Sequence, residues 1–209
     1  ESEHDIVESS HASSSVSWAD GISRAVHVRG ERDRYVVAVV GDGALTGGMT
    51  WEAMNNISHD NDRNLIIVVN DNGRSYAPTI GGLARFLGSV RTQKSYRFFR
   101  GGSEAFFNLF GPFGRAVYRG FRGAARGFVS RFANNESLYS NLDIKYVGPI
   151  DGHNLQDLEK AFAQAKAYRQ PVIVHVITEK GRGFPPAVND EADQFHAVGQ
   201  IDPVTGTPM

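Results

Sequence analysis

Two polar turns, each placed directly after an apolar run, carry side chains that suit metal and phosphate chemistry. Asp42 lies in a Gly-Asp-Gly turn after the run 35–40, and Asn72 lies in an Asn-Asp-Asn-Gly turn after the run 64–69. A carboxylate and an amide oxygen are hard ligands suited to Mg²⁺. Because two protein ligands leave most of an octahedron open, Mg²⁺ held in this way commonly accepts phosphate oxygens. The pattern indicates a magnesium–diphosphate site if the two turns lie close together.

The backbone around the first turn also suits a phosphate. Gly43 would let a phosphate approach the main chain closely, because glycine has no side chain. A helical pattern follows over 49–58, and its start near 46–49 would aim free N–H groups and the positive end of the helix dipole at that phosphate. Each turn alone is ordinary loop chemistry. Their separation by the length of about one strand–helix–strand unit favours a functional interpretation of the pair.

Strands and helices alternate in the predicted structure. The first two predicted strands are continuous apolar runs rich in β-branched residues, typical of strands buried on both faces in a parallel sheet. The predicted strands cover 35–40, 64–69, 144–147 and 172–177, and the predicted helices cover 12–28, 49–58 and 154–167, the last capped by Asn154. This order predicts an α/β fold with a mainly parallel sheet flanked by helices. Ligands bind outside the carboxyl ends of such strands, where both turns lie.

Composition excludes several classes of protein. The chain contains no cysteine, which excludes a disulfide framework and a thiolate zinc site and fits a reducing compartment. The formal net charge is −1, so the whole chain has no general affinity for polyanions. No uninterrupted apolar run approaches the ~20 residues of a membrane span. We therefore expect a cytoplasmic protein.

The segment 85–132 differs from the rest of the chain. It holds ten of the thirteen phenylalanines and ten basic residues against one acid, Glu104. Interleaved arginine and phenylalanine can bind nucleic acid, and a basic amphipathic helix can lie on an anionic membrane. Because the segment is inserted between core strands, we instead expect a helical, mobile insertion over about 85–140, with neither nucleic acid nor membrane as a partner.

Several motifs together resemble one enzyme family. A Gly-Asp-Gly turn followed by Asn72 at this interval is similar to the diphosphate-binding fingerprint of thiamine-diphosphate enzymes. Further motifs cover 1–5, 10–14, 41–48, 51–55, 70–76, 146–153 and 180–184. In this order they resemble the 1-deoxy-D-xylulose-5-phosphate synthase family, and the variants at 72–76 and 201–206 resemble its actinobacterial members. The resemblance covers nearly the whole chain and is weakest over 85–140.

The resemblance implies roles for particular residues. Mg²⁺ would be bound by Asp42, by the side chain of Asn72 and by the backbone carbonyl of Arg74. His153 matches an active-site histidine implicated in substrate binding and proton transfer. The cofactor, thiamine diphosphate, would contact Ser10, His11, Ala12, Gly43, Ala44, Asn72 and Phe184, with Lys180 nearby to offset phosphate charge. Phe184 occupies a position that is often tyrosine, and it keeps the apolar contact but lacks the hydroxyl.

Simpler roles remain open for some of these residues. His11 could cap the helix that follows it, and His153 could serve only as a loop residue before its helix. Glu52 could lie near a subunit interface or on a solvated helix face. The other histidines, His4, His27, His59, His175 and His196, carry no motif and are assigned no role.

The resemblance also implies an activity. Family members decarboxylate pyruvate and transfer the two-carbon unit to D-glyceraldehyde 3-phosphate, feeding isoprenoid, thiamine and pyridoxal phosphate synthesis, and they are homodimers. We expect residues 1–209 to form the diphosphate-binding domain, with a linker over about 198–209. The family's upstream histidine motifs, and its downstream domain with the activating glutamate, do not occur in this sequence. We therefore expect little or no activity from this chain alone. The alternatives are another transketolase-family transferase and a catalytically inactive cofactor-binding module.

Overall fold

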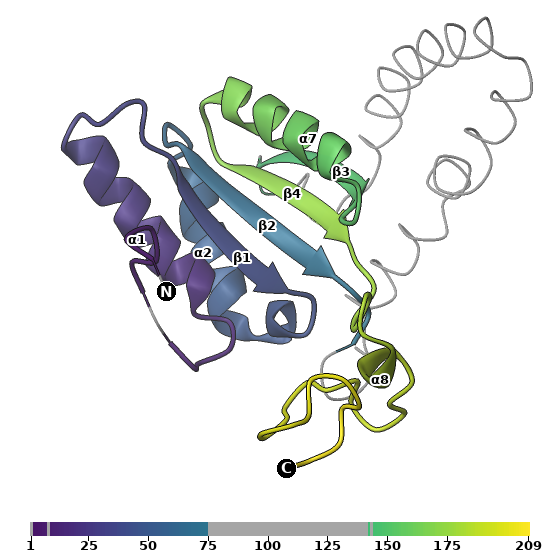
Figure 1. Cartoon of the computed structure of the whole chain (residues 1–209). Coiled ribbons are helices and arrows are strands. Elements are labelled where there is room, and N and C mark those ends of the chain that lie inside the picture. The colour runs from purple at the N-terminus through teal and green to yellow at the C-terminus, as the bar shows by residue number, and fades with distance from the viewer. Residues whose placement is uncertain (1, 8, 75–141, 143) are drawn as a thin grey trace, which may run out of the picture.

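The computed structural model describes residues 2–7, 9–74, 142 and 144–209 (Figure 1). The predicted elements are present, with boundaries shifted by a few residues. In chain order the structure has α1 (Ser15–Val28), β1 (Val36–Gly41), the 3₁₀ turn η1 (Ala44–Thr46), α2 (Gly48–His59), β2 (Leu65–Asp71), β3 (Lys145–Asp151), α7 (Leu155–Tyr168), β4 (Val172–Ile177) and α8 (Pro185–Val188). The predicted insertion over 85–140 lies outside the described residues.

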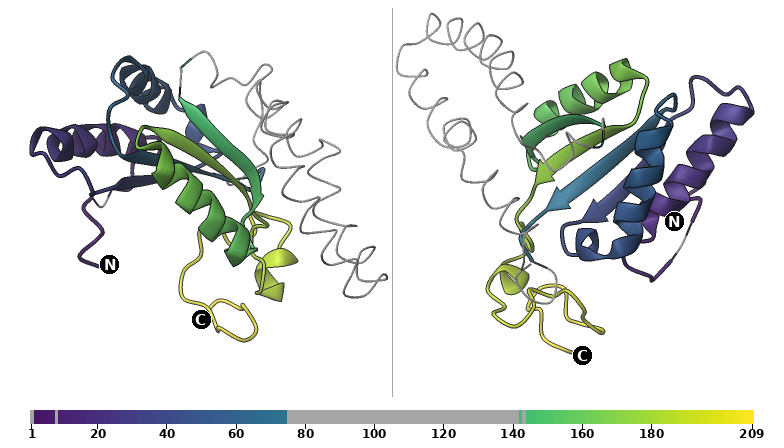
Figure 2. Two further views of the ribbon diagram at one scale, coloured as in Figure 1. Left: turned by 90° about the horizontal axis from the view of Figure 1, so that it is seen from above. Right: turned by 180° about the vertical axis from the view of Figure 1, so that it is seen from behind.

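The four strands form one parallel sheet in the order β1-β2-β4-β3. Helices α1 and α2 pack on one face of this sheet and α7 packs on the other, as the two views in Figure 2 show. The prediction of an α/β fold with a mainly parallel sheet is confirmed. Because β1 and β2 are hydrogen-bonded neighbours, the two polar turns that follow them lie at the same edge of the sheet.

The core lies on both faces of the sheet, but it does not cover β1 completely. On the α1–α2 face, alternate residues of β1 and β2 pack against Leu45, Met54 and Ile57. On the opposite face, Val37 and Val39 of β1 are 52% and 62% exposed. The prediction that this strand is buried on both faces is therefore wrong in the described structure. The reason is position, since β1 is the edge strand and α7 packs against β3 and β4.

Local signals explain where two of the helices begin. Asn154 caps α7, and its side chain accepts a hydrogen bond from the backbone N–H of Asp157, as predicted. The helix after the Gly-Asp-Gly turn begins at Gly48, and the 3₁₀ turn η1, which was not predicted, lies between the turn and α2. This short turn brings Leu45 into the core, where it is fully buried.

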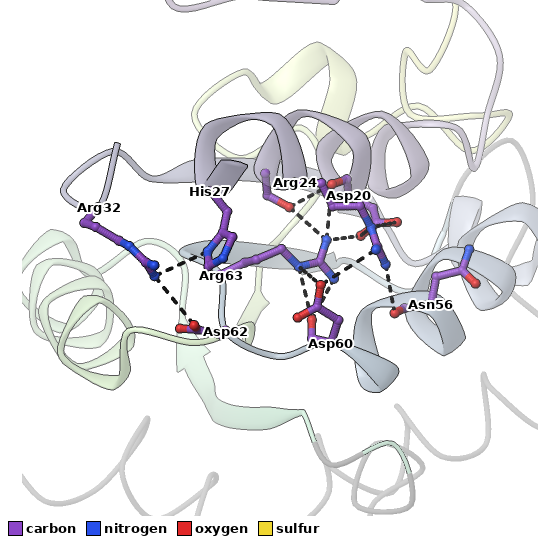
Figure 3. Close-up of polar contacts among 9 residues, drawn as sticks. Asp20, Arg24, His27, Arg32, Asn56, Asp60, Asp62 and Arg63 are labelled. Atoms are coloured by element: carbon purple, nitrogen blue, oxygen red, sulfur yellow. Dashed lines mark hydrogen bonds and ion pairs between the residues drawn. The ribbon is translucent and has the colours of Figure 1, made fainter. Parts of the chain in front are cut away.

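A buried arginine joins α1 to the loop before β2 (Figure 3). The side chain of Arg63 is 1% exposed and forms an ion pair with Asp20 of α1. Its Nη2 and Nε also donate to the backbone carbonyl oxygen of Asp60, at 2.8 and 3.1 Å. The guanidinium therefore fixes the position of α1 relative to the sheet.

Beyond the carboxyl ends of the strands, the chain forms α8 and then turns without further helices up to residue 209 (Figure 1). The predicted linker over 198–209 includes one β-bridge between Ile201 and Pro208. Across the part of the chain that is described, none of the helices is both long enough and apolar enough to cross a membrane.

Candidate functional site

Asp42 lies directly after β1 at the carboxyl edge of the sheet. It is only 2% exposed, and its backbone N–H donates to the carbonyl oxygen of Asn70 at 3.1 Å. This bond continues the β1–β2 pairing by one residue beyond Gly41 and Asn70. The turn after β1 is therefore held against the turn after β2, as the magnesium hypothesis requires.

The turn after β2 contains two oxygen atoms of the kind that bind metals, the side-chain oxygen of Asn72 and the carbonyl oxygen of Arg74. Gly73 has a φ of 79°, a conformation that favours glycine. This geometry lets the backbone N–H of Arg74 donate to Oδ1 of Asn72 at 3.0 Å, which orients the amide group. An amide oxygen keeps acceptor capacity after one hydrogen bond. Asn72, the carbonyl of Arg74 and the carboxylate of Asp42 make an all-oxygen donor set, which fits Mg²⁺ better than a softer metal.

No alternative metal centre competes with this donor set among the described residues. In residues 2–7, 9–74, 142 and 144–209, no three His, Cys, Asp or Glu side chains gather where they could hold a metal ion. A metal at the carboxyl edge would therefore depend on one carboxylate with amide and carbonyl oxygens. Such a site is incomplete without waters or ligand oxygens, which a diphosphate supplies.

The loop before α1 lies against the Gly-Asp-Gly turn. The hydroxyl of Ser13 donates to the carbonyl oxygen of Ala44, and the hydroxyl of Thr50 donates to the carbonyl oxygen of Ser13 at 3.2 Å. Ser14 in turn donates to the carbonyl oxygen of His11 at 2.8 Å. These bonds bring the loop with Ser10, His11 and Ala12 to the turn that contains Gly43 and Ala44. At the start of α1, the N-cap residue is Ser14 and not His11, and the Ser14 side chain makes no capping bond.

Gly47 is required by the close approach of this loop. A Cβ atom at Gly47 would lie 1.9 Å from Oγ and 2.7 Å from Cβ of Ser13. We expect Gly47→Ala to destabilise the protein by about 1–3 kcal/mol, the usual cost of overpacking. Thermal unfolding measures the effect. Gly48→Ala is the matched control, because a Cβ there meets no atom within 4 Å. An equal melting temperature for the two variants would contradict the close packing of Ser13.

His153 lies in the loop between β3 and α7 and is exposed. Nε2 of its ring accepts a hydrogen bond from the backbone N–H of Glu179 at 2.9 Å. The backbone N–H of His153 donates to the Asp151 carboxylate at 3.0 Å. A neutral imidazole that accepts at Nε2 carries its proton on Nδ1. The ring is therefore oriented by the loop after β4, and Nδ1 is the nitrogen that can donate a proton.

Lys180 lies in the same loop after β4. Its Nζ donates to the carbonyl oxygen of Asp193 at 2.7 Å and lies 3.1 Å from Nδ1 of His196. Burial lowers the pKa of the Lys180 ammonium, an effect that the Asp193 carboxylate opposes. The carboxylate of Asp42 also acts on this pKa, so Lys180 lies within electrostatic reach of the predicted metal ligand.

Phe184 is held in a turn by its own neighbours. Its ring packs edge-on against Phe195, with 5.9 Å between the ring centroids. The carboxylate of Asp190 accepts hydrogen bonds from three backbone N–H groups, those of Asp193, Gln194 and Phe195. These bonds, the one from Asp193 first, lower the pKa of Asp190. Because the carboxylate is the accepting form, the turn is stabilised above the ordinary pKa of Asp190 and loosens as the pH falls through the lowered value.

Arg74 connects the turn that contains Asp190 to the turn after β2. Its Nη2 donates to the carbonyl oxygens of Glu191, at 3.2 Å, and of Ala192. Its Nε is buried without a hydrogen-bond partner in the described part of the chain. A buried donor of this kind carries a desolvation cost that an anionic ligand at this edge would remove. Five of the predicted site residues thus lie in loops at or beyond the carboxyl ends of the strands: Asp42, Asn72, His153, Lys180 and Phe184.

Some residues of this region were not predicted from the sequence to belong to the site. His196 approaches Lys180, and Thr178 donates to Oδ1 of Asn70 at 2.7 Å. His175, in β4, is 1% exposed and joins Asp71 and Tyr146 in a hydrogen-bonded chain. The one available signal was a histidine inside an otherwise apolar strand. Glu52 is exposed on α2, which leaves both of its proposed roles open.

A parallel sheet with helices on both faces, with the turns of Asp42 and Asn72 at its carboxyl edge, is consistent with an α/β fold of the thiamine-diphosphate-binding class. A family profile described as 1-deoxy-D-xylulose-5-phosphate synthase matches residues 1–178. The chain belongs to this family.

Proteins named 1-deoxy-D-xylulose-5-phosphate synthase are similar to the chain over its whole length. The protein of Clavibacter sepedonicus is 69% identical over 209 residues, and that of Leifsonia xyli subsp. xyli (strain CTCB07) is 70% identical over 210 residues. That of Tropheryma whipplei (strain Twist) is 65% identical over 206 residues, or 99% of this chain. The predicted resemblance to actinobacterial members is confirmed. The chain spans about a third of the length of these relatives: 32%, 32% and 33%.

Proposed function

We propose that the full-length protein is a 1-deoxy-D-xylulose-5-phosphate synthase and that this chain holds the diphosphate end of its cofactor through Mg²⁺. The observation that carries the proposal is the pairing of β1 with β2, which brings the turns of Asp42 and Asn72 to one edge of the sheet. Membership of the family supports the same conclusion. The substrates would be pyruvate, as the donor, and D-glyceraldehyde 3-phosphate, as the acceptor.

Each part of the site has a distinct task in this proposal. Asp42, the amide oxygen of Asn72 and the carbonyl of Arg74 would hold Mg²⁺, which would offset the negative charge of a diphosphate. The loop of Ser10, His11 and Ala12 and the turn of Gly43 and Ala44 surround the cofactor, and Phe184 supplies an apolar contact. Lys180 offsets phosphate charge. Bound thiamine diphosphate supplies the electron sink for decarboxylation.

His153 is the proton donor of the proposal. Its Nε2 is occupied by the N–H of Glu179, so the Nδ1–H of this exposed residue is the group that would hydrogen-bond a substrate oxygen. Histidine suits this task because its protonation changes near neutral pH. The hydrogen bond from the N–H of Glu179 fixes the ring, and the bond from the backbone N–H of His153 to Asp151 fixes the loop, which lowers the entropic cost of aligning the ring with a substrate.

The wider assignments follow from the family. The product, 1-deoxy-D-xylulose 5-phosphate, would feed isoprenoid, thiamine and pyridoxal phosphate synthesis. We also propose that the full-length protein is a cytoplasmic homodimer. Exposed apolar side chains on β1, Val37 and Val39, are compatible with further protein packing there.

The test of this function compares the full-length protein with residues 1–209 alone. With Mg²⁺ and thiamine diphosphate, the full-length protein should release CO₂ from pyruvate and form 1-deoxy-D-xylulose 5-phosphate when D-glyceraldehyde 3-phosphate is added. The isolated chain should give little or no turnover, since it spans only 32% of the Clavibacter relative. Robust turnover by the isolated chain would contradict this prediction.

Two further assays separate the alternatives. Transfer from a ketose phosphate such as xylulose 5-phosphate, in place of pyruvate, would identify another transketolase-family transferase. Cofactor binding without turnover on either donor would identify an inactive cofactor-binding module.

A further inference from the structure

A chain of three polar side chains, two of them buried and the third, Tyr146, half-buried, crosses the sheet diagonally on the face covered by α1 and α2. Nε2 of His175 lies 3.0 Å from Oδ2 of Asp71, and the hydroxyl of Tyr146 lies 2.6 Å from Nδ1 of the same ring. His175 pairs with Val69 in the β2–β4 register, and Tyr146 pairs with Ile173 in the β3–β4 register. The chain therefore runs from β3 through β4 to the last residue of β2.

The direction of each hydrogen bond follows from the chemistry of the groups. A carboxylate only accepts, so Nε2 of His175 donates to Asp71. In the neutral ring Nδ1 then accepts, and the hydroxyl of Tyr146 is its donor. Both His175 and Asp71 are 1% exposed. The imidazole thus holds one orientation and presents one N–H to the end of β2.

The hydrogen-bonded chain of Tyr146, His175 and Asp71 ends next to the turn that contains the proposed metal ligand Asn72. Asp71 directly precedes Asn72, so a rotation of Asp71 would move the amide oxygen that is proposed to bind Mg²⁺. A second pair of bonds from β4 acts at the same place, since Thr178 donates through its N–H to the carbonyl oxygen of Asp71 at 3.0 Å and through its hydroxyl to Oδ1 of Asn70 at 2.7 Å. The side chains of Asn70 and Asp71, which precede Asn72, are therefore hydrogen-bonded to Thr178 and to His175 of β4.

Stability alone does not account for a buried polar chain at this position. Well-packed apolar residues of similar volume commonly replace buried charged groups without loss of stability. The neighbouring positions on this face, Val69 and Ile173, are apolar and fully buried. Hydrogen bonds differ from apolar contacts in fixing direction, and residues behind a metal ligand commonly set its orientation.

We propose that His175, supported by Thr178, is a positioning residue for the metal ligand Asn72, and this inference rests on the proposed function. His175 itself touches neither metal nor cofactor in this account. It orients Asp71, which fixes the backbone from which the Asn72 amide projects.

The test measures binding of thiamine diphosphate to the full-length protein by calorimetry at a series of Mg²⁺ concentrations. In His175→Gln, the terminal amide nitrogen can replace Nε2 as the donor to Asp71, whereas the shorter amide of His175→Asn cannot reach it. We expect His175→Asn to lower the apparent Mg²⁺ affinity by about 10–100-fold and His175→Gln to lower it by less than about 5-fold, in line with other residues behind metal ligands. Thr178→Val keeps the side-chain shape, should fold, and should also lower the Mg²⁺ affinity.

Ile173→Val is the matched control, because it truncates a buried residue of the same strand and face without removing any of these hydrogen bonds. It should lower the melting temperature and leave the Mg²⁺ affinity unchanged. Wild-type Mg²⁺ affinity in both His175→Asn and Thr178→Val would overturn the inference, as would equal losses in the Gln, Asn and Ile173 variants. If the wild-type protein itself binds the cofactor independently of Mg²⁺, the proposed function fails first, so the two failures are distinguishable.

Discussion

Replacing Asp42 by asparagine in the full-length protein is expected to weaken Mg²⁺ binding by more than about 100-fold, because loss of a residue that only supports a metal ligand already costs about 10–100-fold. Asp42 contributes the one carboxylate of the proposed donor set, and asparagine retains its size but not its charge. Turnover at saturating pyruvate should fall with it, and high Mg²⁺ should restore part of the loss.

The control for this variant is Asp190→Asn. Asp190 is also an aspartate of the carboxyl-edge loops, but its carboxylate accepts backbone N–H groups of its own turn. Its replacement should loosen that turn, which Arg74 contacts, and should therefore weaken Mg²⁺ binding far less than removal of a ligand does. Calorimetric titration of both variants with Mg²⁺ measures the difference, and equal Mg²⁺ affinities would argue against Asp42 as a ligand.

Arg63→Met is expected to cost about 3–5 kcal/mol of stability, since removal of the buried partner leaves the Asp20 carboxylate with only the half-exposed Arg24 beside it. The guanidinium, 1% exposed, pairs with Asp20, whose side chain is 11% exposed (Figure 3). It also satisfies the carbonyl oxygen of Asp60. Opening free energies from hydrogen exchange of the β1 and β2 amides in the full-length protein measure the loss for this domain alone.

Arg24→Met provides the comparison for Arg63. Arg24 approaches the same carboxylate, with 3.4 Å from its Nε to Oδ1 of Asp20, but its side chain is 44% exposed. Exposed ion pairs contribute about 0–1 kcal/mol, so this variant should remain close to the wild type. Similar losses in the two variants would show that burial of Arg63 does not govern its contribution.

The fold could be predicted well where the controlling interactions are local. Asn154 is followed by a helix with apolar spacing, and its capping bond is made within three residues of the chain. The strand 172–177 is apolar except for His175 and is preceded by Pro171, and β4 has those limits. Local sequence determines both features, so no information about the rest of the chain was needed.

Features that depend on distant parts of the chain could not be predicted. The run at 35–40 has the same composition as a central strand, yet β1 is an edge strand with Val39 62% exposed. Strand order, which decides this, is set by packing and not by the run itself. The 3₁₀ turn that buries Leu45 likewise depends on the core that receives it.

The candidate site shows the same division. Asp42 and Asn72 could be found from the sequence because each lies directly after its strand and the two are separated by one strand–helix–strand unit. The partner of His175 is Asp71, 104 residues away in the chain, and no local pattern predicts that bond. The tautomer of His153 also depends on a distant group, the N–H of Glu179, 26 residues away.

The central claim is that one Mg²⁺ ion joins the turns after β1 and β2 to a diphosphate. A double-mutant cycle of Asp42→Asn and Asn72→Ala, read out as Mg²⁺-dependent affinity of the full-length protein for thiamine diphosphate, tests it most directly. Two ligands of one ion should be strongly coupled, so the double variant should lose little more affinity than the worse single variant. Independent, additive losses, or unchanged affinity in either single variant, would contradict a shared metal ion.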